Sequence, residues 1–165
     1  MFKIKLLISL LISFIFLSCA KNTHEQNGIK YSLSYIGGEY EGLILKNLLI
    51  NNLSSQNLYG DNSIYVLRPS ISHKSNVYIT NIDNTSDRSK IKSELTIEVV
   101  DKRFNCVTQK FDESITQYYI YAAGDKFVSN NRAEKKIIED NTEALVKEFI
   151  SKLKKPDAFC KKMNE

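Results

Sequence analysis

Few residues of this 165-residue chain have side chains that could carry out covalent or metal chemistry. The cysteines are Cys19, Cys106 and Cys160, and the histidines are His24 and His73. Neither histidine has a cysteine or a second histidine at metal-ligand spacing, and there is no Cys-x-x-Cys pair or glycine-rich phosphate loop. Cys106 and His73 could act as nucleophile and base, but no group to orient the base or hold an oxyanion can be named. We therefore expect no enzymatic activity, no cofactor and no metal.

Cys19 is the cysteine whose sequence surroundings suggest a reaction. Phe16-Leu17-Ser18-Cys19 resembles a bacterial lipobox, in which a small residue precedes a cysteine that is lipidated and becomes the first mature residue. Lys3 and Lys5 precede an apolar run at residues 6–17, as in a secretory signal. That run would make about 18 Å of helix, which is shorter than a bilayer core of about 30 Å. We therefore interpret Cys19 as the site of lipid attachment.

A lipobox divides the chain and suggests where it resides. We expect residues 1–18 to be a signal peptide, 19–28 a lipidated tether, 29–155 a single domain and 156–165 a C-terminal tail. Ala20 follows the cysteine in place of the Asp that resembles an inner-membrane retention signal. This favours lipid anchoring in the cell outer membrane, on its periplasmic side.

The overall charge gives little support to a nucleic-acid partner. The formal net charge is +4, and removal of residues 1–18, with Lys3 and Lys5, would lower it to +2. The basic residues are mostly lysines interleaved with acidic residues, which is typical of a solvated surface. A hydrophobic content of 42% is enough for one globular core.

Four segments are predicted as strands, and three of them, residues 30–35, 92–99 and 107–121, alternate between residue types as half-buried strands do. The clearest is residues 92–99, and Pro69 near the end of an earlier segment suggests a sheet edge. Residues 101–105 make a short turn, in which Asn105 tolerates a left-handed backbone, so the last two strands are expected to form an antiparallel hairpin. The predicted strands are residues 30–35, 64–67, 92–99 and 107–121, with a short extended piece at 77–82.

Two further segments, residues 41–53 and 132–153, have apolar residues at helical spacing. The predicted buried positions are Leu45, Leu48, Leu49 and Leu53 in the first helix, and Ile138, Leu145, Phe149 and Leu153 in the second, widened by Ile137, Ala144 and Ile150. The order β-α-β-β-β-α predicts an α+β fold, with two helices on one face of a four-stranded mixed or antiparallel sheet. The other face carries Thr, Gln, Lys and Tyr, and is expected to meet solvent or a partner.

Two groups of residues have open interpretations. Cys106 and Cys160 could form a disulfide in an oxidising periplasm, or could be two separate small apolar residues. Arg88, Lys90 and Lys92 lie together near the clearest strand, where they could contact the phosphates of a lipid head group or could simply be solvated. The cluster of Tyr118, Tyr119 and Tyr121 suits an interface, and equally suits half-buried strand packing.

Several segments between Gly38 and Leu153 together resemble one family. The helix Glu41-Gly42-Leu43-Ile44-Leu45-Lys46-Asn47-Leu48-Leu49, the segment Thr85-Ser86-Asp87-Arg88, the hairpin ending in Ser114-Ile115-Thr116-Gln117-Tyr118 and the helix at 131–153 occur in the family's order. With the lipobox and the length, they are similar to the LPS-assembly lipoprotein family LptE, particularly its alphaproteobacterial forms. Asn105 stands where that family would have a glycine.

The resemblance implies a non-enzymatic role in lipopolysaccharide transport. LptE-like proteins sit in the lumen of the outer-membrane β-barrel LptD, plug it, help to assemble it and bind lipopolysaccharide for insertion into the outer leaflet. Under this implication, Arg88, Lys90 and Lys92 become candidate lipopolysaccharide contacts. Two alternatives remain: an auxiliary lipoprotein of an ABC-type lipid transporter, and a periplasmic hydrolase that uses Cys106.

Overall fold

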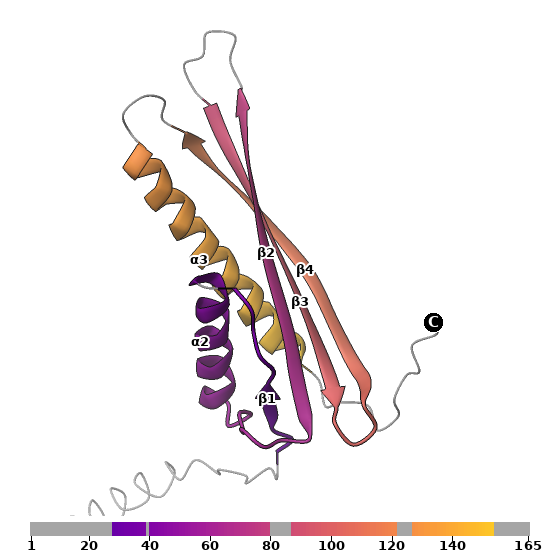
Figure 1. Ribbon diagram of the computed structural model, residues 1–165. Coiled ribbons are helices and arrows are strands. Elements are labelled where there is room, and N and C mark those ends of the chain that lie inside the picture. Colours follow the sequence, from indigo (N-terminus) through magenta and orange to yellow (C-terminus); the bar gives the residue numbers. More distant parts are fainter. Residues whose placement is uncertain (1–27, 39, 80–86, 122–126, 154–165) are drawn as a thin grey trace, which may run out of the picture.

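The computed structural model describes residues 28–38, 40–79, 87–121 and 127–153. These residues form a four-stranded sheet and two helices in the order β-α-β-β-β-α, which confirms the predicted α+β fold (Figure 1). The elements are β1 (Tyr31–Leu33), α2 (Tyr40–Ser55), β2 (Tyr65–Ile79), β3 (Asp87–Asp101), β4 (Cys106–Tyr121) and α3 (Phe127–Lys152).

The sheet has the strand order β1-β2-β3-β4 and is mixed. β1 pairs with β2 in parallel over only three residues, whereas β2, β3 and β4 are long antiparallel neighbours. The predicted hairpin is β3 and β4, and Asn105 in its turn has a φ of 47°. An asparagine therefore takes the left-handed conformation for which glycine is the commoner choice.

β2 is much longer than the predicted strand at residues 64–67, and it also includes part of the extended piece predicted at residues 77–82. The structure joins residues 65–79 into one strand that pairs with β3 along its whole length. The intervening residues include Ser70, Ser72 and Lys74, which are exposed and give no apolar alternation. Pro69 lies just beyond the last residue of β2 that pairs with β1, so the predicted sheet edge begins there.

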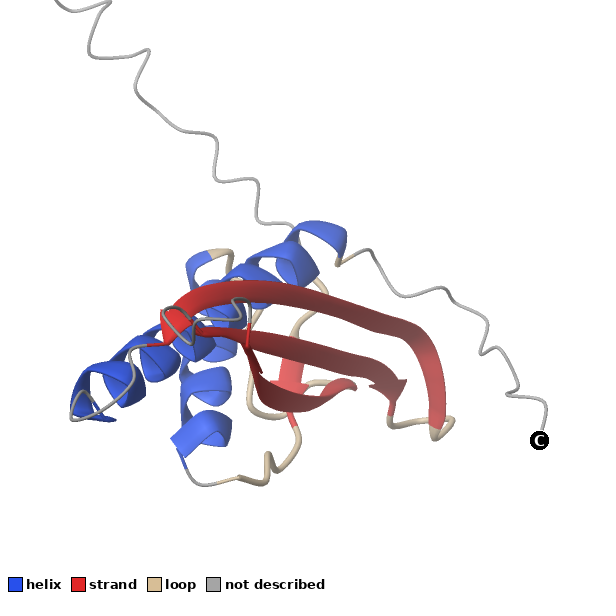
Figure 2. Ribbon diagram, turned by 90° about the horizontal axis from the view of Figure 1, so that it is seen from above, coloured by secondary structure: helices blue, strands red, loops and turns tan. Residues whose placement is uncertain are grey.

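The core lies between the two helices and one face of the sheet (Figure 2). Alternate residues of β3 are fully buried on this face, as the pattern of residues 92–99 predicted. Phe111 of β4 packs edge-on against Phe149 of α3, with ring centroids 5.5 Å apart. Each such apolar side chain contributes roughly 1.5–3 kcal/mol when it is fully buried. The central buried residues are Leu45, Leu49, Leu53, Leu95, Ile97, Val99, Leu145, Val146 and Phe149.

The buried face of α3 differs from the prediction at residues 142, 144 and 146, and the predicted Ile137 and Ile138 are only half-buried. Ala144 was expected to widen the apolar stripe, but it is exposed, whereas Val146 is fully buried. Thr142 is also buried and donates its hydroxyl to the carbonyl of Ile138, one turn earlier. That internal bond lets a polar residue occupy the sheet-facing side of the helix, so the stripe includes Thr142 and Val146 and excludes Ala144.

A polar contact joins α3 to the middle of the sheet. The amide of Asn141 donates to the Ser93 hydroxyl at 3.0 Å, and this hydroxyl is 2.8 Å from Nδ1 of His73. Ser93 and Asn141 are fully buried. Burial lowers the pKa of His73, and nearby Glu41 opposes this in part. The half-buried histidine is therefore best accommodated in its neutral form.

We predict that Ser93→Ala destabilises the fold by about 1–3 kcal/mol, because it leaves the amide of Asn141 and the ring of His73 without their shared hydroxyl in a buried place. Urea unfolding followed by circular dichroism measures the change. Ser114→Ala is the matched control, since Ser114 is an exposed serine on the opposite side of the sheet. Equal stability of the two variants would contradict the prediction.

Candidate interaction surface

The face of the sheet turned away from the helices is polar and uncovered. On β3 it consists of the even-numbered residues, which alternate with the buried odd-numbered ones. Residues directly opposite each other in antiparallel strands share a face, so the register defines the neighbouring members. We call this the open face, and its residues with described side chains are Arg68, Ser70, Ser72, Lys74, Asn76, Arg88, Lys90, Lys92, Glu94, Thr96, Glu98, Lys110, Asp112, Ser114, Thr116, Tyr118 and Ile120.

One end of the open face is basic. The three predicted contact residues, Arg88, Lys90 and Lys92, lie at alternate positions of β3 and therefore share this face. Lys92 is opposite Lys74 of β2. We call these four residues, Lys74, Arg88, Lys90 and Lys92, the basic end.

Apolar groups lie beside the cations of the basic end. Tyr118 is opposite Lys90, and Ile120 is opposite Arg88. Tyr118 is 61% exposed and Ile120 is 72% exposed, so both side chains are accessible. This end of the face therefore combines positive charge with accessible apolar area.

Only part of the positive charge is compensated. Glu94 lies 2.5 Å from the ammonium of Lys92 and 3.7 Å from that of Lys74. The hydrogen bond from Lys92, followed by the charges of Lys92 and Lys74, lowers the pKa of Glu94. Arg88 and Lys90 make no ion pair with any of the described residues. Arg88 is exposed and Lys90 is half-buried.

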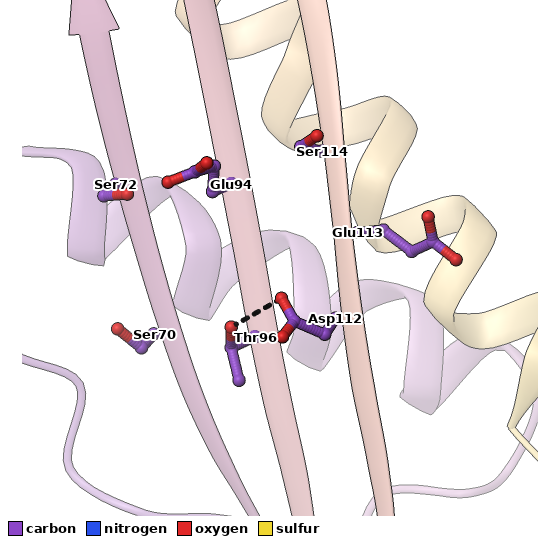
Figure 3. Close-up of a pocket in the computed structure, with 7 residues that line it drawn as sticks. All are labelled: Ser70, Ser72, Glu94, Thr96, Asp112, Glu113 and Ser114. Carbon is purple, nitrogen blue, oxygen red and sulfur yellow. Dashed lines mark hydrogen bonds between the residues drawn. The ribbon is translucent and has the colours of Figure 1, made fainter.

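A shallow hollow of about 360 Å³ lies on the open face beyond Glu94. Its lining is made of hydroxyl and carboxylate groups, and Figure 3 shows Thr96 donating to Asp112, at 3.2 Å. Asp112 lies 3.7 Å from Lys110, and Glu113 is bound by Lys152 at 2.8 Å. Within the described ranges, no three His, Cys, Asp or Glu residues are grouped to hold a metal ion. The hollow adds hydrophilic surface to the open face. Its lining residues are Ser70, Ser72, Glu94, Thr96, Asp112, Glu113 and Ser114.

The other predicted site residues are not brought together. His73 is paired with Ser93 in the middle of β3, whereas Cys106 is paired with Asp101 at its end. At about 3.4 Å per residue, this separates them by more than about 20 Å, so they cannot act as nucleophile and base. Cys106 is disulfide-bonded, and its partner lies outside the described residues. The pairing with Cys160 therefore stays a prediction, as does lipidation of Cys19, which also lies outside them.

Sequence reasoning did not place Lys74 or Ile120 beside the predicted basic residues. Lys74 lies in the stretch of β2 that was not predicted as strand, so its position opposite Lys92 could not be anticipated. The signal that could have located Ile120 is its even position after Tyr118, in the same arm. Residues two positions apart along a strand lie on the same face.

Comparison with known proteins gives structural similarity without sequence similarity. No protein-family model matches the chain. A search of curated proteins also gives no match. The chain is similar to the minor lipoprotein of Acinetobacter baumannii, with 17% identity, a TM-score of 0.58, and coverage of 75% of this chain and 89% of that chain.

Two further solved structures are similar to this chain. Rare lipoprotein B of Shewanella oneidensis has 15% identity and a TM-score of 0.57, over 74% of this chain and 89% of its own. The uncharacterized lipoprotein B of Nitrosomonas europaea has 10% identity and a TM-score of 0.51, over 73% and 79% respectively. The chain thus has a fold shared by bacterial lipoproteins of known structure. Among the described residues, no helix is long and apolar enough to cross a membrane.

Proposed function

We propose that this chain is an outer-membrane lipoprotein of the LptE kind, which plugs and helps to assemble the β-barrel LptD and takes part in lipopolysaccharide insertion into the outer leaflet. The observation that carries the proposal is the one-sided sheet, whose open face is hydrophilic and has a basic end with exposed Tyr118 and Ile120. The fold shared with rare lipoprotein B and the lipobox-like Phe16–Cys19 segment support it.

A barrel plug needs a rigid domain that presents polar surface to a hydrophilic lumen. Here both helices and the buried side of β3 form the core, so the open face needs no further covering for the fold to be stable. Its hydroxyls, amides and charges can exchange hydrogen bonds with water for hydrogen bonds with polar groups of a barrel wall. The open face is thus the surface that we assign to the barrel.

The basic end suits a phosphate-bearing amphiphile. The guanidinium of Arg88 and the ammonium of Lys90 can make charge-assisted hydrogen bonds to phosphate oxygens. Tyr118 and Ile120, which lie opposite these two cations, can contact the apolar part of the same molecule. Lipopolysaccharide has both features, and we assign its contact to Arg88 and Lys90 first, with Lys92 partly neutralised by Glu94.

We predict that Cys19→Ala abolishes lipid labelling, because the thiol is the acyl acceptor in the proposed lipobox. Metabolic labelling with radioactive palmitate, followed by purification of the full chain, measures this. Cys160→Ala serves as the matched cysteine control and is expected to keep the label. Labelling of the Cys19→Ala chain would refute lipidation at this residue.

We predict that the tagged full chain recovers a large outer-membrane β-barrel protein from detergent-solubilised membranes, because the open face is the proposed contact with the barrel. Adding a large charged side chain to the face with Thr96→Arg should reduce this recovery, whereas Lys147→Glu on the exposed side of α3 should not. Recovery of no barrel, or of ABC-type transporter subunits alone, would contradict the proposed function.

Lipopolysaccharide binding is expected to depend on the basic end. The double variant Arg88→Ala with Lys90→Ala should weaken binding to purified lipopolysaccharide by about tenfold or more, since each charged hydrogen bond is worth about 1.5–3 kcal/mol. Its stability should change by less than about 0.5 kcal/mol, as for surface substitutions generally. The matched control, Lys46→Ala with Arg132→Ala, removes the same two charges from exposed helix positions. An equal loss of affinity in both double variants would argue against a specific site.

A further inference from the structure

The hollow on the open face forms where short side chains lie between long charged ones. Two adjacent rows of residues across β2, β3 and β4 make its floor, and we call them the floor rows (Figure 3). In register, the floor rows are Ser72, Glu94 and Ser114, then Ser70, Thr96 and Asp112. The flanking rows of the open face carry longer side chains, namely Lys74 and Lys92 on one side, and Arg68, Glu98 and Lys110 on the other.

The floor rows have the dimensions of a small polar ring. Neighbouring strands are about 4.8 Å apart, and residues two positions apart along a strand are about 6.8 Å apart. Three strands and two rows therefore cover roughly 10 Å by 7 Å. Together with the volume of about 360 Å³, this area suits one or two sugar rings.

The carboxylates of the hollow are offset by lysines. Each of them has an ammonium group at 3.7 Å or closer, in the pairs Lys92–Glu94, Lys110–Asp112 and Lys152–Glu113. An ionised carboxylate has about four lone-pair sites, so each one still accepts further hydrogen bonds. The hollow thus offers strong acceptors without a large uncompensated negative charge. That combination suits neutral hydroxyl groups better than it suits a cation.

The hydroxyls of the floor rows complete this pattern. Thr96 donates to Asp112, whereas the hydroxyls of Ser70, Ser72 and Ser114 make no hydrogen bond with another residue that the structure describes. Each free hydroxyl can donate one hydrogen bond and accept others. Donors and acceptors on three strands can therefore pair with several hydroxyls of one sugar.

We propose that the floor rows bind a sugar of the same amphiphile whose phosphates contact the basic end, an inference that rests on the proposed binding of lipopolysaccharide. Lys74 and Lys92 belong to the basic end and directly border the floor rows. Lys90 and Glu94 are four residues apart on β3, or about 14 Å, so one molecule with phosphates next to sugars reaches both. Because the flanking side chains are longer, a barrel wall that rests on them leaves the hollow to the sugar.

The test compares lipopolysaccharide that has a complete core with lipid A, which has the phosphates and acyl chains but lacks the core sugars. Surface plasmon resonance on the captured full chain measures both affinities. The wild-type chain is expected to bind lipopolysaccharide about fivefold or more tightly than lipid A, because several hydrogen bonds to sugar hydroxyls are added. Ser72→Leu with Ser114→Leu fills the hollow and should remove this preference without changing lipid A binding. Arg88→Ala with Lys90→Ala should weaken both ligands.

The matched control is Ser54→Leu with Ser129→Leu, which changes two exposed helix serines and should keep the preference. Far-UV circular dichroism checks that each variant is folded. A second measurement uses core oligosaccharide stripped of phosphate, which should shift the backbone amide NMR signals of residues 70–72, 94–96 and 112–114.

Equal affinity of the wild-type chain for lipopolysaccharide and lipid A would overturn the proposal, as would a preference that survives in the filled variant. Loss of barrel recovery by the filled variant with its preference intact would assign the hollow to the barrel wall and would also overturn it. In each of these cases, the proposed binding of lipopolysaccharide stands. A chain that binds neither ligand would refute that binding, and the sugar site with it.

Discussion

Burial on only one face of the sheet is the constraint on which the rest of the structure depends. Both helices pack on the side of β3 that carries Leu95, Ile97 and Val99, and these residues are fully inaccessible to solvent. Because side chains alternate along a strand, the same residues that build the core force the intervening ones onto the other face. The polar open face is thus a direct consequence of the packing.

The fold could be predicted largely from local patterns. The alternation of residues 92–99 defined β3, Asn105 marked the hairpin turn, and the spacing of Leu45, Leu49 and Leu53 defined the buried side of α2. The pairing of β2 with β3 determined the part of the fold that these local patterns could not predict. The middle of β2 has no apolar alternation, and it is extended because β3 offers it a complete hydrogen-bonding partner. That pairing sets Lys74 opposite Lys92.

The candidate site could likewise be predicted only in part, because some of its contacts depend on the pairing of distant strands. Alternate spacing was enough to put Arg88, Lys90 and Lys92 on one face, because it depends on β3 alone. The residues that neighbour these three cations lie on β2 and β4. The register between strands that are distant in the chain cannot be deduced from the sequence of either strand. Glu94 shows the consequence: its single carboxylate lies near both Lys92 and Lys74, so it offsets only part of their two positive charges.

In the proposed arrangement, the open face meets the partner while the opposite face forms the core. Cysteine accessibility along β3 tests it most directly, with a membrane-permeable thiol reagent on Lys90→Cys, Thr96→Cys and Ile97→Cys chains and the unsubstituted chain as background. We predict that positions 90 and 96 react in the detergent-purified chain and are protected in native outer membranes, whereas position 97 reacts in neither. Equal reaction of positions 90 and 96 in both preparations would contradict the claim.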